Sequence, residues 1–332
     1  MFFLNLLILV AGFAALIKGS DLFVDGSAAL ARNFRVPALI IGLTIVAMGT
    51  SAPELAVSTV AAIEGANEIS VSNVLGSNLC NLLLVLGLSA VIRPIPVDKS
   101  VLKKDFPVSV VPTAALFLLT GGLCLLNGTL FQMNMSAEAG VVSRPIAFGL
   151  LAVFAVYMYS LFRSARKHRQ DEAEQTDPAA GEKTYTNRKC ALLIVIGLVL
   201  IIGGGQAVVY SAREIARALG MTETMIGLTV VALGTSLPEL FTSVMATRKG
   251  ETELAFGNVL GSNIFNLLLI LGVSAAIKPV GVNAASVWDM LIVLVTTCFA
   301  WICSAREKRI NRAEGIIMVV VYFATMVFAV VR

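Results

Sequence analysis

Long apolar stretches, separated by short polar ones, run through the whole sequence. Ten of them are apolar over about 17–25 residues, the length at which an α-helix crosses the hydrocarbon core of a bilayer. Their approximate limits are 2–20, 38–63, 71–92, 106–126, 146–162, 190–209, 225–247, 255–277, 287–303 and 314–331. The pattern therefore predicts an all-α membrane protein with ten transmembrane helices.

Two of these stretches contain a proline and a glutamate in the same short motif. Residues 49–54 read GTSAPE and residues 234–239 read GTSLPE. A proline inside a helix removes one backbone N–H and clashes with the carbonyl four residues earlier, so each motif predicts a broken helix. Irregular backbone at membrane depth is tolerated where it is buried in protein or lines a wet cavity, and an intramembrane glutamate is a candidate functional residue. The two motifs together indicate the ion site of a transporter.

A single strongly hydrophilic stretch, residues 163–189, separates five apolar stretches from the other five. It mixes acidic and basic residues with Pro178 and Gly181, which is typical of a linker. We therefore expect a first repeat over 1–162, this linker, and a second repeat over 190–332. The linker holds seven Lys and Arg residues, and the positive-inside rule places such a stretch in the cytoplasm.

Alternating outward from a cytoplasmic linker assigns a side of the membrane to every other loop. The loops placed inside hold 19 Lys and Arg residues, whereas those placed outside, with the C-terminus, hold 5. This bias agrees with ten spans in a cell membrane and with both termini outside. Met1 opens directly into an apolar stretch without the basic residues that begin a cleavable signal peptide, so we expect the first span to be retained.

The two halves of the chain repeat one another, without a gap, at an offset of 185 residues. Over residues 42–94, 31 of 53 positions are identical to their counterparts in 227–279, far more than shared hydrophobicity explains. Each half contributes five spans, and an odd number reverses the orientation of the second copy. We therefore expect two inverted repeats, related by a pseudo-two-fold axis in the membrane plane, whose glutamate motifs enter from opposite sides.

Polar side chains gather on one face of the motif helices and of the spans that follow them. Thr50, Ser51 and Glu54 are spaced by three and four residues, so they can share a helix face. The next span and the second copy of the repeat add Asn73, Ser77 and Asn81, and then Thr235, Ser236, Glu239, Asn258, Ser262 and Asn266. Oxygen ligands that include two carboxylates suit a hard cation such as Ca²⁺ or Na⁺ and disfavour an anion.

These features also have ordinary structural explanations, which remain open at this point. The serine and glutamate of each motif fit a capping box, in which both side chains bind backbone N–H groups at the start of a helix. The Asn and Ser stripes could hydrogen-bond one helix to another. Asn78 and Asn263 lie off the stripes and could do only this. Asp21 and Asp25 lie near a helix end that water can reach, where acidic residues are usually solvated.

The composition excludes a soluble globular protein, because 57% of the residues are hydrophobic and only 14% are charged. Nucleic acid is not expected as a partner: the net charge is only +4, and the basic residues lie between apolar spans. Five scattered cysteines form no disulfide or zinc pattern, the sole histidine lies in the linker, and there is no HExxH motif. We therefore expect a protein surrounded by the lipid bilayer, with no enzyme activity and no cofactor.

The duplicated motifs resemble those of the calcium/cation antiporter superfamily, in particular the prokaryotic sodium/calcium exchangers of about this length. The signature is GTSxPE on one helix followed by GNxxGSNxxN on the next. It occurs twice here, with Ser72 in place of the first glycine of the first copy. The resemblance covers nearly the whole chain. It implies a ten-helix fold of two inverted five-helix repeats, with broken helices at the ion site.

The resemblance also implies a set of ion ligands, with Glu54 and Glu239 at its centre. Around them the family places side chains at Thr50, Ser51, Ser77, Thr235, Ser236 and Ser262, and backbone carbonyls at Ala47 and Ala232. Asn81 and Asn266 fill the remaining central positions, where some members have an aspartate in one of the two. Two asparagines remove one possible negative charge, which leaves potassium dependence and the number of ions open.

A two-glutamate site favours a cation antiporter that exchanges Ca²⁺ for Na⁺ by alternating access, with movement of the first and sixth helices. An empty site would take two unpaired carboxylates through a poorly solvated state at several kcal/mol each, which makes exchange obligatory. Protons could neutralise the glutamates as well, so a Ca²⁺/H⁺ exchanger is the alternative. A cation channel would need a continuous pore, usually at an oligomer axis. These ligands belong to one chain instead, and we expect a functional monomer.

Overall fold

The computed structural model describes residues 2–65, 67–128, 130, 134–175, 185–220 and 232–331. Within these ranges eight helices are long and apolar enough to cross a membrane, and the pair Ala38–Thr50 and Ala52–Glu64 would make a ninth if the two form one span. The prediction of a multi-pass helical membrane protein is therefore confirmed. The first part of the predicted seventh span, residues 225–231, lies outside the described residues, and the total of ten spans stays a prediction.

Backbone contacts divide the chain into two compact units, called unit 1 and unit 2 below. Unit 1 comprises Met1–Thr50 and Met158–Gly261, and unit 2 comprises Ser51–Tyr157 and Ser262–Arg332. Each unit thus combines segments from both halves of the sequence. The predicted repeats over 1–162 and 190–332, with the linker between them, describe internal homology and stay a prediction.

Unit 1 consists of helices and short helical segments. They are α1 (Phe2–Phe34), α2 (Ala38–Ile41), the π-helix η1 (Gly42–Val46), α3 (Ala47–Thr50), the C-terminal part of α10 (Arg144–Gln175), α11 (Asn187–Ala218), α13 (Ala232–Gly234), α14 (Leu237–Arg248) and most of α15 (Thr252–Ile264). The apolar core of this unit joins α1 and α11 to α14 and α15, with Leu16, Phe23, Ile201 and Leu254 completely buried.

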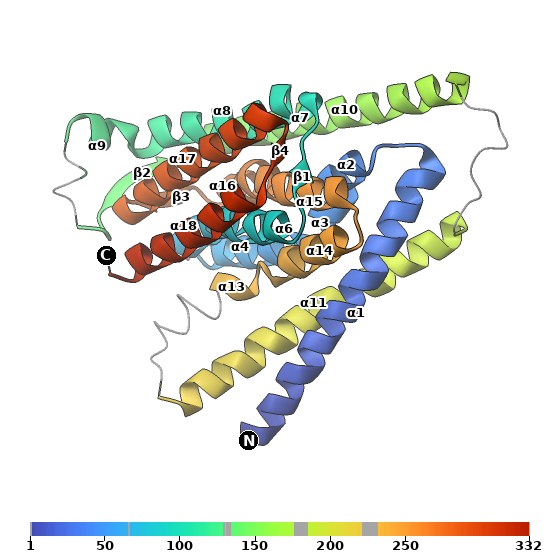
Figure 1. Cartoon of the computed structure of the whole chain (residues 1–332). Coiled ribbons are helices and arrows are strands. Elements are labelled where there is room, and N and C mark those ends of the chain that lie inside the picture. Colours follow the sequence, from blue (N-terminus) through green and yellow to red (C-terminus); the bar gives the residue numbers. More distant parts are fainter. Residues whose placement is uncertain are drawn as a thin grey trace. The chain divides into compact units, whose positions relative to one another are not determined.

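Helices α1 and α11 lie side by side and antiparallel (Figure 1). A Cβ atom on Gly12 would lie 3.0 Å from the carbonyl oxygen of Gly204, and one on Gly19 would lie 2.8 Å from that of Gly197. Such distances leave no room for a larger side chain, so these glycines let the two backbones touch. Because each helix repeats its glycine after seven residues, the contact extends over about two turns.

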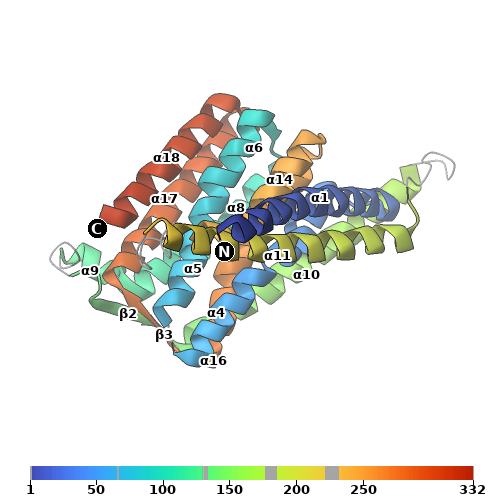
Figure 2. The same ribbon diagram turned by 90° about the horizontal axis from the view of Figure 1, so that it is seen from below.

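Unit 2 contains the remaining helices and two small antiparallel ribbons. Its helical elements are α4 (Ala52–Glu64), α5 (Asn67–Leu79), η2 (Cys80–Val85), α6 (Leu86–Ile92), α7 (Lys99–Lys103), α8 (Asp105–Phe117), η3 (Leu118–Gly122), α9 (Leu123–Leu126), the first part of α10, the last residues of α15, η6 (Phe265–Ile270), α16 (Leu271–Ile277), α17 (Ala284–Glu307) and α18 (Arg312–Val331). α6 and α18 pack side by side, with Gly87 against the backbone of Gly315 (Figure 2).

The two ribbons are short and join segments that are distant in the sequence. β1 (Ile95–Pro96) pairs with β4 (Arg309–Ile310), and β2 (Glu138–Val142) pairs with β3 (Val280–Asn283). The apolar pattern does not predict them, because strands of two to five residues are too short for a periodicity to show. The fold is thus predominantly helical, with a small β component in its loops.

Two of the π-helices, η2 and η6, are related by the same offset of 185 residues as the sequence repeat. In each, the N–H of the residue after the π-helix binds a carbonyl five residues earlier: Leu86 binds Asn81, and Leu271 binds Asn266. π-Helical turns within α-helices are rare and occur frequently at functional sites. The wider turn therefore coincides with the asparagines that the sequence indicates as candidate ligands.

Candidate cation site

Both glutamate motifs lie where a new helix begins. In the first, α4 begins at Ala52 with Pro53 in its first turn, directly after Ser51, whose φ is −84° and ψ is 7°. In the second, α14 begins at Leu237 after Ser236, with φ −89° and ψ 4°. Proline is tolerated there because an N–H in the first turn has no helical partner. Neither serine side chain makes a capping hydrogen bond, so the capping box does not account for the motif.

Glu54 and Glu239 lie in the first turns of α4 and α14, and both side chains are completely buried. A carboxylate buried within a membrane protein is costly unless an opposite charge compensates it. The part of the chain that the structure describes contains no group of three or more His, Cys, Asp and Glu residues placed to hold a metal ion. A cation site at either glutamate would therefore depend on neutral oxygens as well as on carboxylates.

In unit 1, Asn258 connects the two segments that contain candidate ligands. Its Nδ2 donates to the hydroxyl of Ser243 at 2.9 Å and lies 3.5 Å from the backbone carbonyl oxygen of Glu239. Its Oδ1 accepts a hydrogen bond from the hydroxyl of Thr50 at 3.0 Å. The hydroxyl of Thr50 also lies 3.4 Å from the carbonyl oxygen of Ala47. Thr50 and Ala47 are thus held beside the glutamate-bearing segment of the second motif.

Close packing of α15 on η1 and α3 supports this arrangement. A Cβ on Gly42 would lie 2.6 Å from the carbonyl oxygen of Leu254, and one on Gly261 would lie 2.8 Å from the Cβ of Ala47. Only glycine allows such an approach, and small residues serve this purpose in membrane helices. The Gly42 and Gly261 positions of the repeat are therefore needed for packing, which places Asn258 within reach of Thr50.

In unit 2, Asn73 makes the same contacts in the first copy. Its Nδ2 donates to the hydroxyl of Ser58 at 2.9 Å and lies 3.4 Å from the backbone carbonyl oxygen of Glu54. Ser58 and Ser243 are themselves related by the offset of 185 residues. The first residue of each polar stripe therefore hydrogen-bonds its helix to the preceding, glutamate-bearing helix. For Asn73 and Asn258, the interpretation as interhelical hydrogen-bonding residues is confirmed.

A second group of asparagines joins the two following helices within unit 2. Asn78 donates to the carbonyl oxygen of Asn263 at 3.3 Å, and Asn263 donates to that of Asn78 at 3.2 Å. The side chain of Asn266 donates to Oδ1 of Asn78 at 3.0 Å. Asn78 and Asn263 thus hydrogen-bond across the helix contact, as the sequence indicates, and they bring the start of η2 close to the start of η6.

Several other buried oxygens in these segments have no hydrogen-bond partner among the described residues. In unit 2 they are the hydroxyl of Ser77, both amide atoms of Asn81 and Oδ1 of Asn266, and in unit 1 the hydroxyl of Ser236. Buried polar atoms in native proteins nearly always have a partner. Such atoms on four of the predicted ligand residues fit a site that binds a cation.

The candidate ligands are divided between the units. Unit 1 contains Ala47, Thr50, Ala232, Thr235, Ser236 and Glu239, and unit 2 contains Ser51, Glu54, Ser77, Asn81, Ser262 and Asn266. Within unit 1, the structure brings Ala47 and Thr50 together with the Glu239 segment through Asn258. Within unit 2, it brings Asn81 and Asn266 into neighbouring π-helices. One site that includes both glutamates stays a prediction.

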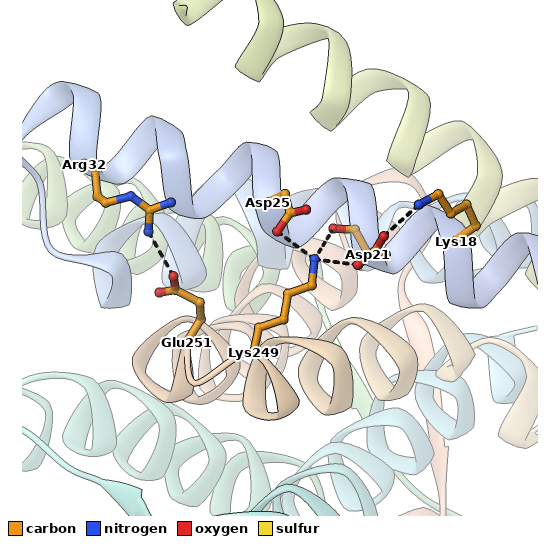
Figure 3. A network of polar contacts seen from close by, with 6 residues as sticks. All are labelled: Lys18, Asp21, Asp25, Arg32, Lys249 and Glu251. Atoms are coloured by element: carbon orange, nitrogen blue, oxygen red, sulfur yellow. Dashed lines mark hydrogen bonds and ion pairs between the residues drawn. The ribbon is translucent and has the colours of Figure 1, made fainter. Parts of the chain in front are cut away.

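Asp21 and Asp25 belong to a polar network that the sequence pattern does not reveal. Lys249 donates to Asp25 at 2.6 Å and also pairs with Asp21, while Arg32 pairs with Glu251 at 2.9 Å (Figure 3). Burial lowers the pKa of Lys249, but its hydrogen bonds to the two aspartates outweigh this and raise the pKa above its usual value. These contacts tie α1 to the turn between α14 and α15 within unit 1.

Asp105 is a buried acidic residue that the sequence reasoning missed. It lies at the start of α8, is 4% exposed, and accepts a hydrogen bond of 2.9 Å from the hydroxyl of Tyr157 on α10. The two residues are 52 positions apart. Its position after a run of basic residues resembles an ordinary loop charge, and no local signal distinguishes it.

Comparison with known proteins identifies the family. The family model described as sodium/calcium exchanger protein matches residues 4–163 and 189–331, one match in each half. The putative antiporter CaxA of Alkalimonas amylolytica is 37% identical over 320 residues, which cover 94% of each chain. The sodium/calcium exchanger MaX1 of Methanosarcina acetivorans is 32% identical over 354 residues, covering 98% of this chain and 99% of the relative.

Solved structures of the sodium-calcium exchanger NCX_Mj share the fold. A crystal soaked with 2.5 mM Na⁺ and 10 mM Sr²⁺ matches with a TM-score of 0.80 and 29% sequence identity, and the match covers 98% of this chain and 99% of that chain. These likenesses extend over the two glutamate motifs and the polar helices that follow them. The resemblance predicted from those motifs is thereby confirmed. The chain belongs to the sodium/calcium exchanger family of cation antiporters.

Proposed function

We propose that this antiporter exchanges Ca²⁺ for Na⁺ at one central site, in which Glu54 and Glu239 supply the negative charge. The observation that supports the proposal best is the set of buried oxygens without hydrogen-bond partners among the described residues. Ser77, Asn81 and Asn266 have such atoms in unit 2, on α5 and in the two related π-helices. Carboxylate and neutral oxygens together are the ligands that Ca²⁺ and Na⁺ prefer.

In the proposed site, the two carboxylates are joined by side-chain oxygens and by two backbone carbonyls. The side chains belong to Thr50, Ser51, Ser77, Asn81, Thr235, Ser236, Ser262 and Asn266, and the carbonyls to Ala47 and Ala232. Asn73 and Asn258 are positioning residues in this proposal, because their amide groups donate to Ser58 and Ser243. They hold the polar helices against the helices that contain the glutamates.

Charge couples the two ion fluxes. Two carboxylates match the charge of one Ca²⁺, and several Na⁺ can replace it by using the neutral oxygens as well. An empty site would keep two buried charges uncompensated, at a cost of several kcal/mol each. The change between inward-facing and outward-facing states is therefore favourable only when the site is loaded. In the proposed fold of two inverted five-helix repeats with broken helices, α1 and α11 are the first and sixth spans and the elements that move.

The distribution of positive charge supports an orientation for the chain. The proposal places it in the cell membrane with both termini outside and the linker 163–189 in the cytoplasm. It acts as a monomer, because each charged ligand occurs once in the chain. Ca²⁺ and Na⁺ are transported rather than retained, so no cofactor is involved.

Glutamine at the two glutamate positions tests the proposed site. Gln keeps the size and hydrogen-bonding capacity of Glu but cannot neutralise a divalent cation. We expect Glu54→Gln and Glu239→Gln to fold and insert, and to lose Na⁺-driven ⁴⁵Ca²⁺ uptake in proteoliposomes. Glu64→Gln and Glu253→Gln remove exposed acidic residues near the ends of the same helices and should leave uptake unchanged. Near-normal exchange in both site variants would refute the site assignment.

A further inference from the structure

Unit 1 contains an apolar cavity of about 370 Å³ that is partly open to its surroundings. One wall is formed by the end of α1 and by the segment α2 to α3, including Phe34, Ile40 and Met48. The other wall is one face of α10. The volume lies within the range of cavities that bind small organic molecules, roughly 300–1,000 Å³. The hydroxyl of Thr44, which also lines the cavity, donates to the carbonyl of Ile40 at 2.6 Å and so leaves this wall apolar.

The α10 wall changes from apolar to basic along its length. Met158, Phe162 and Ala165 line the cavity first, and Arg166 and Arg169 line it at the far end. These spacings of four, three, one and three residues keep all five side chains on one helix face. From the first to the last, the helix rises by about 16 Å. The cavity therefore has an apolar length with two guanidinium groups at one end.

Nothing among the described residues neutralises these two arginines. Both are exposed, and neither makes a salt bridge to an acidic side chain whose position the structure describes. The flanking side chains are apolar and exposed as well: Phe162 is 65% exposed and Met48 is 58% exposed. Such side chains suit contact with lipid tails, whereas arginines directly after a span suit the headgroup region.

We propose that this cavity binds one anionic phospholipid, with an acyl chain between α10 and the segment α2 to α3 and the phosphate on Arg166 and Arg169. The planar guanidinium group binds phosphate oxygens in pairs, which gives a phosphate a defined position. Basic pockets beside membrane helices on the cytoplasmic side bind anionic headgroups in this way. The inference goes beyond ion exchange and does not depend on the proposed cation site.

The test measures lipid binding to the whole purified protein in detergent, by native mass spectrometry. Phosphatidylglycerol and phosphatidylcholine with identical acyl chains are compared. Two charges near a lipid surface contribute about 1 kcal/mol each, which corresponds to roughly ten- to thirtyfold in affinity. We expect phosphatidylglycerol to bind more tightly than phosphatidylcholine by about this factor. Equal binding of the two lipids would refute the proposal.

Two pairs of variants separate the cavity from general surface charge. Arg166→Gln with Arg169→Gln should lower phosphatidylglycerol binding to the level of phosphatidylcholine, while Arg163→Gln with Lys167→Gln, which removes two charges that do not line the cavity, should not. Ala165→Trp should fill the cavity and weaken binding of both lipids, while Val156→Trp, at an exposed position outside it, should not. Equal losses in both charge variants, or unchanged binding in Ala165→Trp, would contradict a defined site. Melting temperature in detergent verifies that every variant is folded.

Discussion

Individual residues of the repeated polar stripes have different roles. Asn73 and Asn258 form corresponding hydrogen bonds in two copies that share 185 as their offset, and each binds a serine on the preceding helix. Asn81, eight residues after Asn73, is buried without a hydrogen-bond partner among the described residues. A stripe that looks uniform in the sequence therefore consists of a structural first position and later positions available to a ligand.

This difference predicts opposite results for two alanine substitutions. Asn73→Ala leaves the hydroxyl of Ser58 without its donor, so we expect a loss of stability of about 1–3 kcal/mol. Asn81→Ala removes no hydrogen bond that the structure shows, so we expect an unchanged melting temperature and reduced Ca²⁺ uptake. Thermal unfolding in detergent and ⁴⁵Ca²⁺ uptake in proteoliposomes measure the two effects. Equal destabilisation by both substitutions would show that Asn81 is structural too.

At the residue scale, the sequence predicts the candidates but not their partners. The duplication alone identifies Glu54, Glu239 and the asparagines, because corresponding residues recur at a constant offset. The partners Ser58 and Ser243 remain hidden, since a serine on an apolar helix is common and its hydrogen bond depends on how two helices pack. Tyr157 is missed for the same reason, because it is paired with an acidic residue 52 positions away.

Glycine spacing governs how the long helices α1 and α11 associate. Gly204 and Gly203 are neighbours, but only Gly204 faces α1: a Cβ there would lie 2.8 Å from the carbonyl oxygen of Gly12, whereas a Cβ on Gly203 would have nothing within 4 Å. Contacts of this kind stabilise membrane helix pairs through van der Waals packing of the backbones. The pair forms a long, smooth contact, which suits the proposed movement of these helices.

The two neighbouring glycines supply a matched pair of substitutions. We expect Gly204→Leu to push α11 away from α1, lower the melting temperature and abolish transport, because the obstacle is backbone and cannot move aside. Gly203→Leu adds the same side chain on the open face and should be tolerated. Size-exclusion chromatography, thermal unfolding and Ca²⁺ uptake of both variants provide the comparison. Similar behaviour of the two variants would contradict the packing described for this helix pair.

At the element scale, hydrophobicity predicts where helices cross the membrane better than where they end. The apolar stretch 146–162 corresponds to α10, but that helix spans Arg144–Gln175, because charged residues continue a helix after the membrane contact stops. The π-helices η2 and η6 have no signature in hydropathy at all. Their extra residue per turn is a property of backbone hydrogen bonds, which the apolar pattern does not encode.

The orientation of the whole chain follows from its positive charges. A single cysteine at Gln170, introduced into a variant without the five native cysteines, should react with a membrane-impermeant maleimide only from the cytoplasmic side. Leu219, which is 71% exposed in the segment after α11, supplies the reciprocal position and should react only from outside. Right-side-out and inverted vesicles distinguish the two. Labelling of the Gln170 position from outside would reverse the proposed topology.

At the scale of the whole molecule, the repeat and the family can be predicted from sequence, whereas the compact units cannot. The duplicated motifs alone indicate an exchanger, because a double match of this length is highly specific. Each unit, however, combines segments of both repeats. Asn258 binds Thr50 from the other half of the chain, and such contacts between halves depend on tertiary packing that no linear pattern contains.

The most direct test of the central claim is to identify the ion that drives Ca²⁺ transport. Purified protein in proteoliposomes is loaded with Na⁺ and diluted into Na⁺-free medium at equal pH, and ⁴⁵Ca²⁺ uptake is compared with uptake under a pH gradient without Na⁺. Sodium exchange at a site of two carboxylates and neutral oxygens predicts uptake under the Na⁺ gradient and none under the pH gradient. Uptake that follows the pH gradient and ignores Na⁺ would contradict this account and establish a Ca²⁺/H⁺ exchanger instead.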